Sequence, residues 1–120
     1  GTISSNTFTI ANGALYEISG ILKNITDSEG HDVKVRLTNS VDTLYADREF
    51  NVVATDGSGT TFKAYVTANT DAVDAELHFI LNNPNTDLEL DTLVVRKVVG
   101  LVRNSRSNEA IIATNSTSST

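Results

Sequence analysis

The fold is decided by two runs of sequence separated by a polar loop: Val73-Asp74-Ala75-Glu76-Leu77-His78-Phe79 and Leu88-Glu89-Leu90-Asp91-Thr92-Leu93-Val94-Val95. The first run alternates apolar and polar residues, which is typical of a β-strand with one buried and one solvated face. Its polar set, which includes His78, is expected to face solvent. Its apolar set is expected to face the core: Val73, Ala75, Leu77, Phe79 and Leu81. The second run predicts another strand, whose solvated face carries the three carboxylates Asp87, Glu89 and Asp91.

The same period of two predicts five further strands, at residues 7–10, 15–22, 33–38, 44–53 and 62–67. Gly20 predicts a bulge or a close approach between strands. The segment Thr55-Asp56-Gly57-Ser58-Gly59 has the composition of a hairpin turn. Strands spaced by about ten residues, with no sustained helical period, predict an all-β fold, an antiparallel β-sandwich of jelly-roll type. We expect its core to include Val33, Val35, Leu37, Leu77, Phe79 and Leu90.

The two ends of the chain differ from its centre. We expect one β-sandwich domain at residues 1–103, and a polar Ser/Thr-rich tail at residues 104–120 that contains a short apolar strand, Ala110–Ala113. Position 1 is not methionine, so we expect a mature or excised form. The linker Arg103–Asn108 has no glycine or proline to turn the tail strand back, and residues 1–6 are equally free to reach outward. We therefore expect at least one terminus to pair with a sheet edge of a neighbouring copy.

Composition excludes several classes of partner. Nine basic and fifteen acidic residues give a formal charge of −6, which repels nucleic-acid backbones and anionic lipids. We therefore expect no nucleic-acid binding. No run approaches the ~20 apolar residues of a membrane span, so we also expect no membrane insertion. Cysteine is absent, which excludes disulfides and thiolate metal sites. The richness in Thr, Ser, Asn and Asp favours an extracellular or cell-surface location, and Asn24-Ile25-Thr26 and Asn115-Ser116-Thr117 fit the N-glycan acceptor pattern.

Several segments together resemble one known family. They are Phe8-Thr9-Ile10-Ala11-Asn12-Gly13-Ala14-Leu15-Tyr16-Glu17-Ile18-Ser19-Gly20, the pair Phe50-Asn51-Val52 and Thr61-Phe62, and the run Leu88 to Val95, in which Asp91 follows an apolar residue. Over residues 7–98 the chain is similar to carbohydrate-binding modules of the family 4, 9 and 22 type, which are β-sandwiches. Members of that family usually begin with one or more further strands, and this chain starts after them. The resemblance implies a poly- or oligosaccharide ligand and a structural calcium ion near Asp91.

Two tyrosines are the candidate sugar contacts. Family members stack sugars on aromatic rings, and this chain has no tryptophan. The aromatic residues on apolar faces are expected in the core: Phe8, Tyr16, Phe50, Phe62 and Phe79. Tyr65 and, more weakly, Tyr45 are left as stacking platforms. An exposed tyrosine is also simply a good strand former, so a purely structural role stays open.

Asp91 is the candidate metal ligand. Hard carboxylate and carbonyl oxygens suit calcium, which Asp91 would hold together with backbone oxygens. The strand alone cannot supply the six to eight oxygens that calcium needs, because alternate side chains lie ~6.8 Å apart along it. A solvated acidic face is the alternative interpretation.

Nothing in the sequence indicates catalysis, and we expect the protein not to be an enzyme. It has no cysteine nucleophile, no Gly-x-Ser-x-Gly elbow and no phosphate-binding glycine loop. His31 and His78 are isolated and are expected at the surface. The resulting prediction is a non-catalytic extracellular module that binds a poly- or oligosaccharide. The alternative is a self-assembling structural subunit of an extracellular filament or surface layer, completed by strand exchange between neighbouring chains.

Overall fold

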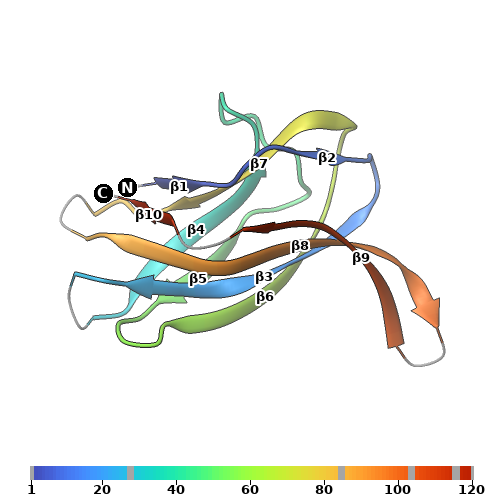
Figure 1. The fold of residues 1–120 in the computed structure, drawn as a ribbon. Coiled ribbons are helices and arrows are strands. Elements are labelled where there is room, and N and C mark those ends of the chain that lie inside the picture. The colour runs from blue at the N-terminus through green and yellow to red at the C-terminus, as the bar shows by residue number, and fades with distance from the viewer. Residues whose placement is uncertain (1, 27–28, 84–85, 103–104, 115–116, 120) are drawn as a thin grey trace.

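Ten β-strands and no helix make up the part of the chain that the computed structural model describes, residues 2–26, 29–83, 86–102, 105–114 and 117–119. In these residues there is accordingly no helix of the length and apolarity that a membrane crossing requires. The strands form two antiparallel sheets in a sandwich-like arrangement (Figure 1). The prediction of an all-β, antiparallel fold is confirmed.

The first sheet has the order β1-β7-β4-β5, and β2 pairs with the other end of β7. Its strands are Thr2–Ser4 (β1), Phe8–Ile10 (β2), His31–Thr38 (β4), Phe50–Ala54 (β5) and Ala72–Ile80 (β7). At its centre β4 and β7 pair Val35 with Phe79 and Leu37 with Leu77. All four side chains point inward, because a strand presents alternate residues to the same face.

The second sheet has the order β10-β8-β3-β6, and β9 also pairs with β8. Its strands are Leu15–Asn24 (β3), Thr60–Thr67 (β6), Leu88–Val102 (β8), Ser105–Thr114 (β9) and Thr117–Ser119 (β10). β3 lies between β6 and β8 and pairs with both over most of its length. β8, the longest strand in the described part of the chain, thus lies between β3 on one side and β9 and β10 on the other.

Both ends of the chain pair with strands of the same chain. The predicted tail strand is part of β9, which pairs antiparallel with β8 from Leu93 opposite Thr114 to Val102 opposite Ser105. β1 likewise pairs with β7, with Thr2 opposite Ile80. The polar linker therefore does not keep the tail strand from pairing within its own chain, and pairing of a terminus with a neighbouring copy stays a prediction. A connection without glycine or proline still allows an antiparallel return.

The core lies between the two sheets. All six predicted core residues are buried: Val33, Val35, Leu37, Leu77, Phe79 and Leu90. Phe62 of β6 and Phe79 of β7 make contact across the core, with ring centroids 5.8 Å apart. Phe50 packs against this core but is only half-buried, because β5 is the outer strand of its sheet.

A β-bulge in β8 explains the glycine in β3. β3 pairs Ser19 with Val94 but Ile21 with Asp91, so β8 contains one extra residue at this point. A Cβ atom on Gly20 would lie 3.3 Å from the carbonyl oxygen of Asp91 and 3.2 Å from the ring of Phe62. Gly20 is thus the close approach between strands that the sequence predicts.

A second bulge overturns the prediction for Val73, which is 78% exposed instead of buried. β2 pairs Phe8 with Ala75 and Ile10 with Ala72, so β7 also contains one extra residue here. The bulge turns Val73 outward and gives the inward position to Ala72, which packs against the core. The rest of the predicted set is buried: Ala75, Leu77, Phe79 and Leu81.

The alternation also gives the wrong prediction for His78, which is expected at the surface but is only 7% exposed. β1 and β4 pair on either side of it. Its Nδ1 atom lies 3.1 Å from a carboxylate oxygen of Asp42, and its Nε2 atom lies 3.0 Å from one of Glu76. Asp42 reaches the ring from the loop after β4, where Asn39 accepts two backbone hydrogen bonds. A loop folded over the outer face therefore buries a polar strand position.

The predicted strand at residues 44–53 is shorter in the structure, where only Phe50–Ala54 form β5. The preceding segment runs beside the end of β6, with Ala46 in an isolated bridge to Ala68. The turn at residues 55–59 then links β5 to β6, which belong to different sheets. It is therefore a turn between layers and not the turn of a paired hairpin.

Phe79→Ala should lower the free energy of unfolding by about 3–5 kcal/mol, because the ring is fully buried between the sheets. Val73→Ala is the matched control. It lies on the same strand and in the same predicted apolar set, but its exposure limits the expected change to about 0.5 kcal/mol. Urea denaturation followed by circular dichroism measures both, and equal losses would contradict the bulge.

Thr92→Asn should raise the free energy of unfolding by about 1 kcal/mol. Thr92 has a φ of 50° at the bulge, a left-handed conformation that is strained for a β-branched residue and tolerated by asparagine. Its side chain is exposed, so the substitution removes no packing. Thr92→Val keeps the branching and should bring no gain in thermal melts. A loss of stability in Thr92→Asn would contradict the strain.

Candidate functional site

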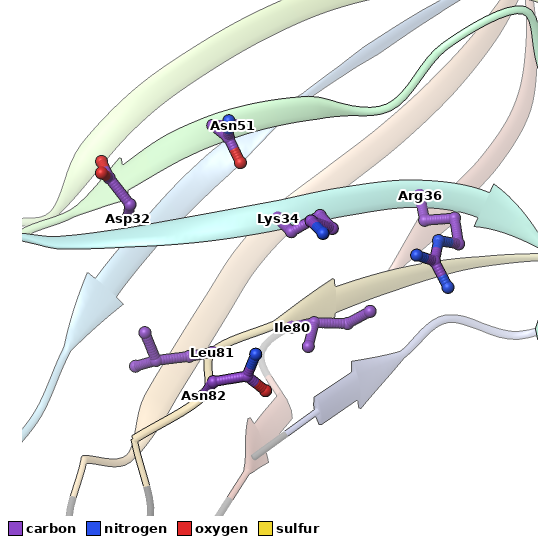
Figure 2. Close-up of a pocket in the computed structure, with 7 residues that line it drawn as sticks. All are labelled: Asp32, Lys34, Arg36, Asn51, Ile80, Leu81 and Asn82. Carbon is purple, nitrogen blue, oxygen red and sulfur yellow. The ribbon is translucent and has the colours of Figure 1, made fainter.

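A groove of about 380 Å³ lies on the outer face of the first sheet (Figure 2). This outer groove is lined by Asp32, Lys34, Arg36, Asn51, Ile80, Leu81 and Asn82. Lys34 lies between Asn51 and Ile80, because β4 pairs with β5 on one side and with β7 on the other. The lining offers charged and amide groups beside a small apolar surface.

Two basic side chains of the outer groove share one carboxylate. Arg36 donates from Nε to Glu49 over 2.7 Å, and its Nη2 atom lies 2.6 Å from the same oxygen. The Nζ atom of Lys34 lies 3.6 Å from the other oxygen of Glu49. Arg36 is thereby fixed, whereas Lys34 is half-exposed and keeps donors available to a ligand.

A second groove, of about 500 Å³, follows β5 and β6, the outer strands of the two sheets. This edge groove is lined by Arg48, Phe50, Asn51, Val52, Thr61, Phe62, Lys63, Ala64 and Tyr65. It combines the partly exposed rings of Phe50 and Tyr65 with polar side chains. Asn51 lines both grooves, so they meet at this residue.

Tyr65, the first predicted sugar contact, is half-buried in the edge groove. Its hydroxyl donates to Oε2 of Glu17 over 2.7 Å, and its carbonyl oxygen accepts from Nη2 of Arg48 over 2.6 Å. Glu17 lies opposite Tyr65 in the β3–β6 ladder, and Arg96 approaches the other oxygen of Glu17 to 3.9 Å. The ring is therefore held in one orientation, which reduces the conformational entropy that a ligand would have to remove.

Tyr45, the second predicted contact, lies apart from the residues that line the two grooves. Its ring packs against the core. Its hydroxyl accepts a hydrogen bond from Nδ2 of Asn39 over 2.9 Å and donates to Oδ1 of Asp74 over 3.0 Å. These contacts tie the loop after β4 to β7. The structure thus does not bring the two tyrosines into one site, and glycan contact at Tyr45 stays a prediction.

The acidic row of β8 lies beside a lysine. Glu89 pairs with Lys23 of β3, and the Nζ atom of Lys23 lies 3.0 Å from its carboxylate. The hydrogen bond and charge of Glu89 raise the pKa of Lys23, and the charge of Asp91 adds to this effect. No group of three His, Cys, Asp or Glu residues in the described ranges could hold a metal ion. This donor set fits calcium poorly, because Lys23 already engages Glu89 and too few carboxylate oxygens converge near Asp91.

The first N-glycan acceptor is buried. Asn24 is 1% exposed, and its Nδ2 atom donates to the carbonyl oxygen of Glu29 over 2.8 Å. Its Oδ1 atom accepts from the backbone N–H of Thr26 over 2.9 Å. The folded chain therefore does not present Asn24 to solvent. The second acceptor, Asn115, lies outside the described residues.

Sequence reasoning missed three residues of the edge groove and its surroundings: Glu17, Arg48 and Asn51. Alternation within β3 and β5 does predict that Glu17 and Asn51 point outward. It does not reveal that Glu17 lies opposite Tyr65, because cross-strand partners follow from the register of two distant strands. Arg48 lies in the part of the predicted strand 44–53 that is not a strand in the structure, so alternation does not give the direction of its side chain.

Calcium binding at Asp91 would raise the melting temperature in millimolar calcium relative to excess chelator, because a ligand that binds only the folded state stabilises it. Asp91→Asn should remove that rise. Asp56→Asn, in an exposed turn, is the matched control and should keep it. Equal melting temperatures of the wild-type protein in calcium and in chelator would exclude a structural calcium ion.

A comparison with known proteins finds no match to the chain among protein-family models, curated proteins or solved structures. The resemblance to carbohydrate-binding modules therefore rests on the sequence segments themselves.

Proposed function

We propose that the protein is a non-catalytic, extracellular or cell-surface module that binds a poly- or oligosaccharide in the edge groove. The observation that carries this proposal is the position of Tyr65, whose ring is oriented by Glu17 within a groove that also contains Phe50 and Asn51. Sugars present an apolar face that packs on aromatic rings and hydroxyl groups that need polar partners. The edge groove offers both kinds of contact.

The meeting of the two grooves supports a ligand of several sugar units. A sugar on Tyr65 has Asn51 beside it, and Asn51 is also part of the outer groove. Lys34 and Asn82 then provide donors for hydroxyl or carboxylate groups of the next units. The ligand would therefore run around the outer edge of β5, from one sheet to the other.

We further infer a jelly-roll order for the two sheets. A jelly roll combines strands 1, 8, 3 and 6 in one sheet and strands 2, 7, 4 and 5 in the other. If β9 and β10 together count as strand 1, and β1 and β2 together as strand 2, the observed orders correspond to this scheme. This correspondence supports the likeness to carbohydrate-binding modules, which are β-sandwiches. It also means that the C-terminal end occupies the position of a first strand.

Tyr65→Ala should weaken glycan binding by about tenfold or more, because an aromatic contact contributes about 0.5–1.5 kcal/mol beyond its buried area. Tyr65→Phe is the matched control. It keeps the ring, loses only the hydrogen bond to Glu17, and should bind within a few-fold of the wild type. Affinity gel electrophoresis and calorimetry with soluble β-glucans, xylans and mannans measure the binding.

Tyr45→Ala tests the weaker predicted contact, and an unchanged affinity would restrict the site to the edge groove. Circular dichroism verifies that each variant is folded before its binding is compared. Absence of binding to every glycan, or equal affinities of the wild type and Tyr65→Ala, would reject the carbohydrate function.

A second candidate function is a structural subunit of an extracellular filament or surface layer. The observation that favours it is the position of the chain ends, because β1 and β10 lie next to each other at the edges of the two sheets. Edge strands contributed by chain ends are the strands that neighbouring copies can exchange. Electron microscopy of concentrated protein tests it, and dispersed particles without ordered polymers would reject it.

A further inference from the structure

The C-terminal segment is attached to the sandwich through one strand. In the described part of the chain, β9 and β10 pair with β8 and with no other strand. Their backbone hydrogen bonds would be the same if the two strands came from another copy of the chain. The edge of β8 is therefore a binding surface for β9 and β10, whichever copy supplies them.

The distal part of this attachment extends beyond the sheet. Pairing of β3 with β8 ends at Leu15 opposite Val98, whereas pairing of β9 with β8 continues to Val102 opposite Ser105. Beyond Val98, the two strands form a two-stranded ribbon that projects from the body of the molecule (Figure 1). An isolated two-stranded ribbon is marginally stable in water.

The connection between the two strands is unfavourable for a tight turn. Only Arg103 and Asn104 separate β8 from β9. Two-residue hairpin loops favour sequences such as Asn-Gly, because their central residues adopt positive φ angles. Arg-Asn contains no glycine, so closing the hairpin within one copy costs free energy that a continuous extended strand avoids.

The register allows the same pairing between two copies. Two bulges, between Val95 and Arg96 and between Val98 and Gly100, cancel each other along the ladder. The pairs at both ends of the ladder therefore share one register. The midpoint of this register lies in the connection between Val102 and Ser105. Two copies that open this connection can form both ladders around a two-fold axis, which closes a symmetric dimer.

The charge distribution supports such a dimer. Residues 92–120 contain four basic residues and one acidic residue, whereas residues 1–91 contain five basic and fourteen acidic residues. In the dimer the shared ribbon lies between the two acidic bodies. The excess of basic residues in this segment then lowers the repulsion between them.

We propose that two copies of this chain form a symmetric dimer by reciprocal exchange of β9 and β10, which pair with β8 of the other copy. This proposal rests on the strand exchange of the second candidate function, and it gives that exchange a donor, an acceptor and a closed symmetry. It does not depend on glycan binding.

Engineered cysteines test whether β9 pairs with β8 of its own copy or of the other copy. They suit this test because the chain has no cysteine of its own. Val94 and Ala113 lie directly opposite each other in the β8–β9 ladder, at a separation that a disulfide can bridge. The single variants Val94→Cys and Ala113→Cys are co-expressed and oxidised. Exchange predicts a disulfide-linked dimer that contains one chain of each variant, identified on non-reducing gels and by mass spectrometry. Val94→Cys with Ser105→Cys, at the far end of β9, is the matched control and should give no such dimer.

The connection supplies an independent test. Arg103→Asn combined with Asn104→Gly introduces the preferred turn sequence and should raise the dissociation constant of the dimer by about tenfold or more, as measured by analytical ultracentrifugation. A wild-type protein that stays monomeric, or mixed single variants that form no joint dimer, would overturn the proposal. A double variant that carries both Val94→Cys and Ala113→Cys tests the symmetry, because each of its chains can be linked to two others. A ladder of linked species larger than a dimer in this variant would overturn the closed dimer. A cross-linked dimer without polymers would keep the exchange and reject the filament.

Discussion

The contact between Phe62 and Phe79 joins the two sheets across the core, with ring planes tilted by 59°. Gly20 lies beside this contact, where the ring of Phe62 and the bulge of β8 converge and leave little room for a side chain. With Phe62 fixed inward, alternation along β6 turns Lys63 and Tyr65 outward. The same constraint that packs the core therefore presents the tyrosine of the edge groove.

Local alternation was sufficient to predict the core wherever strands are regular. Val33, Val35 and Leu37 are buried as the period of two requires. The failures occur at bulges, where one extra residue reverses the faces of the strand beyond it. Val73 is the clearest case, because its exposure follows from a pairing with β2 more than sixty residues earlier in the chain. A pattern within a single strand does not contain that information.

The candidate site could likewise be predicted only as far as the pattern within one strand reaches. Tyr65 could be identified because it faces away from the apolar side of its own strand. Its neighbours could not, because Asn51 reaches the groove only once β5 and β6 are assigned to different sheets. His78 shows the related limit for burial. The loop after β4, in which Asp42 has a positive φ, buries a residue that its strand pattern marks as polar. Register, layer assignment and loop path are tertiary properties, and no local sequence pattern encodes them.

The two proposed interaction surfaces lie at opposite edges of the molecule. The edge groove follows β5 and β6, which end the two sheets on one side, whereas β1 and β10 end them on the other. Exchange of the C-terminal strands therefore leaves the edge groove uncovered. A dimer of this kind would carry two glycan sites in a fixed relation, and a polysaccharide that spans both would bind more tightly than a short oligosaccharide through its higher effective concentration. Weak single sites gain most from such pairing.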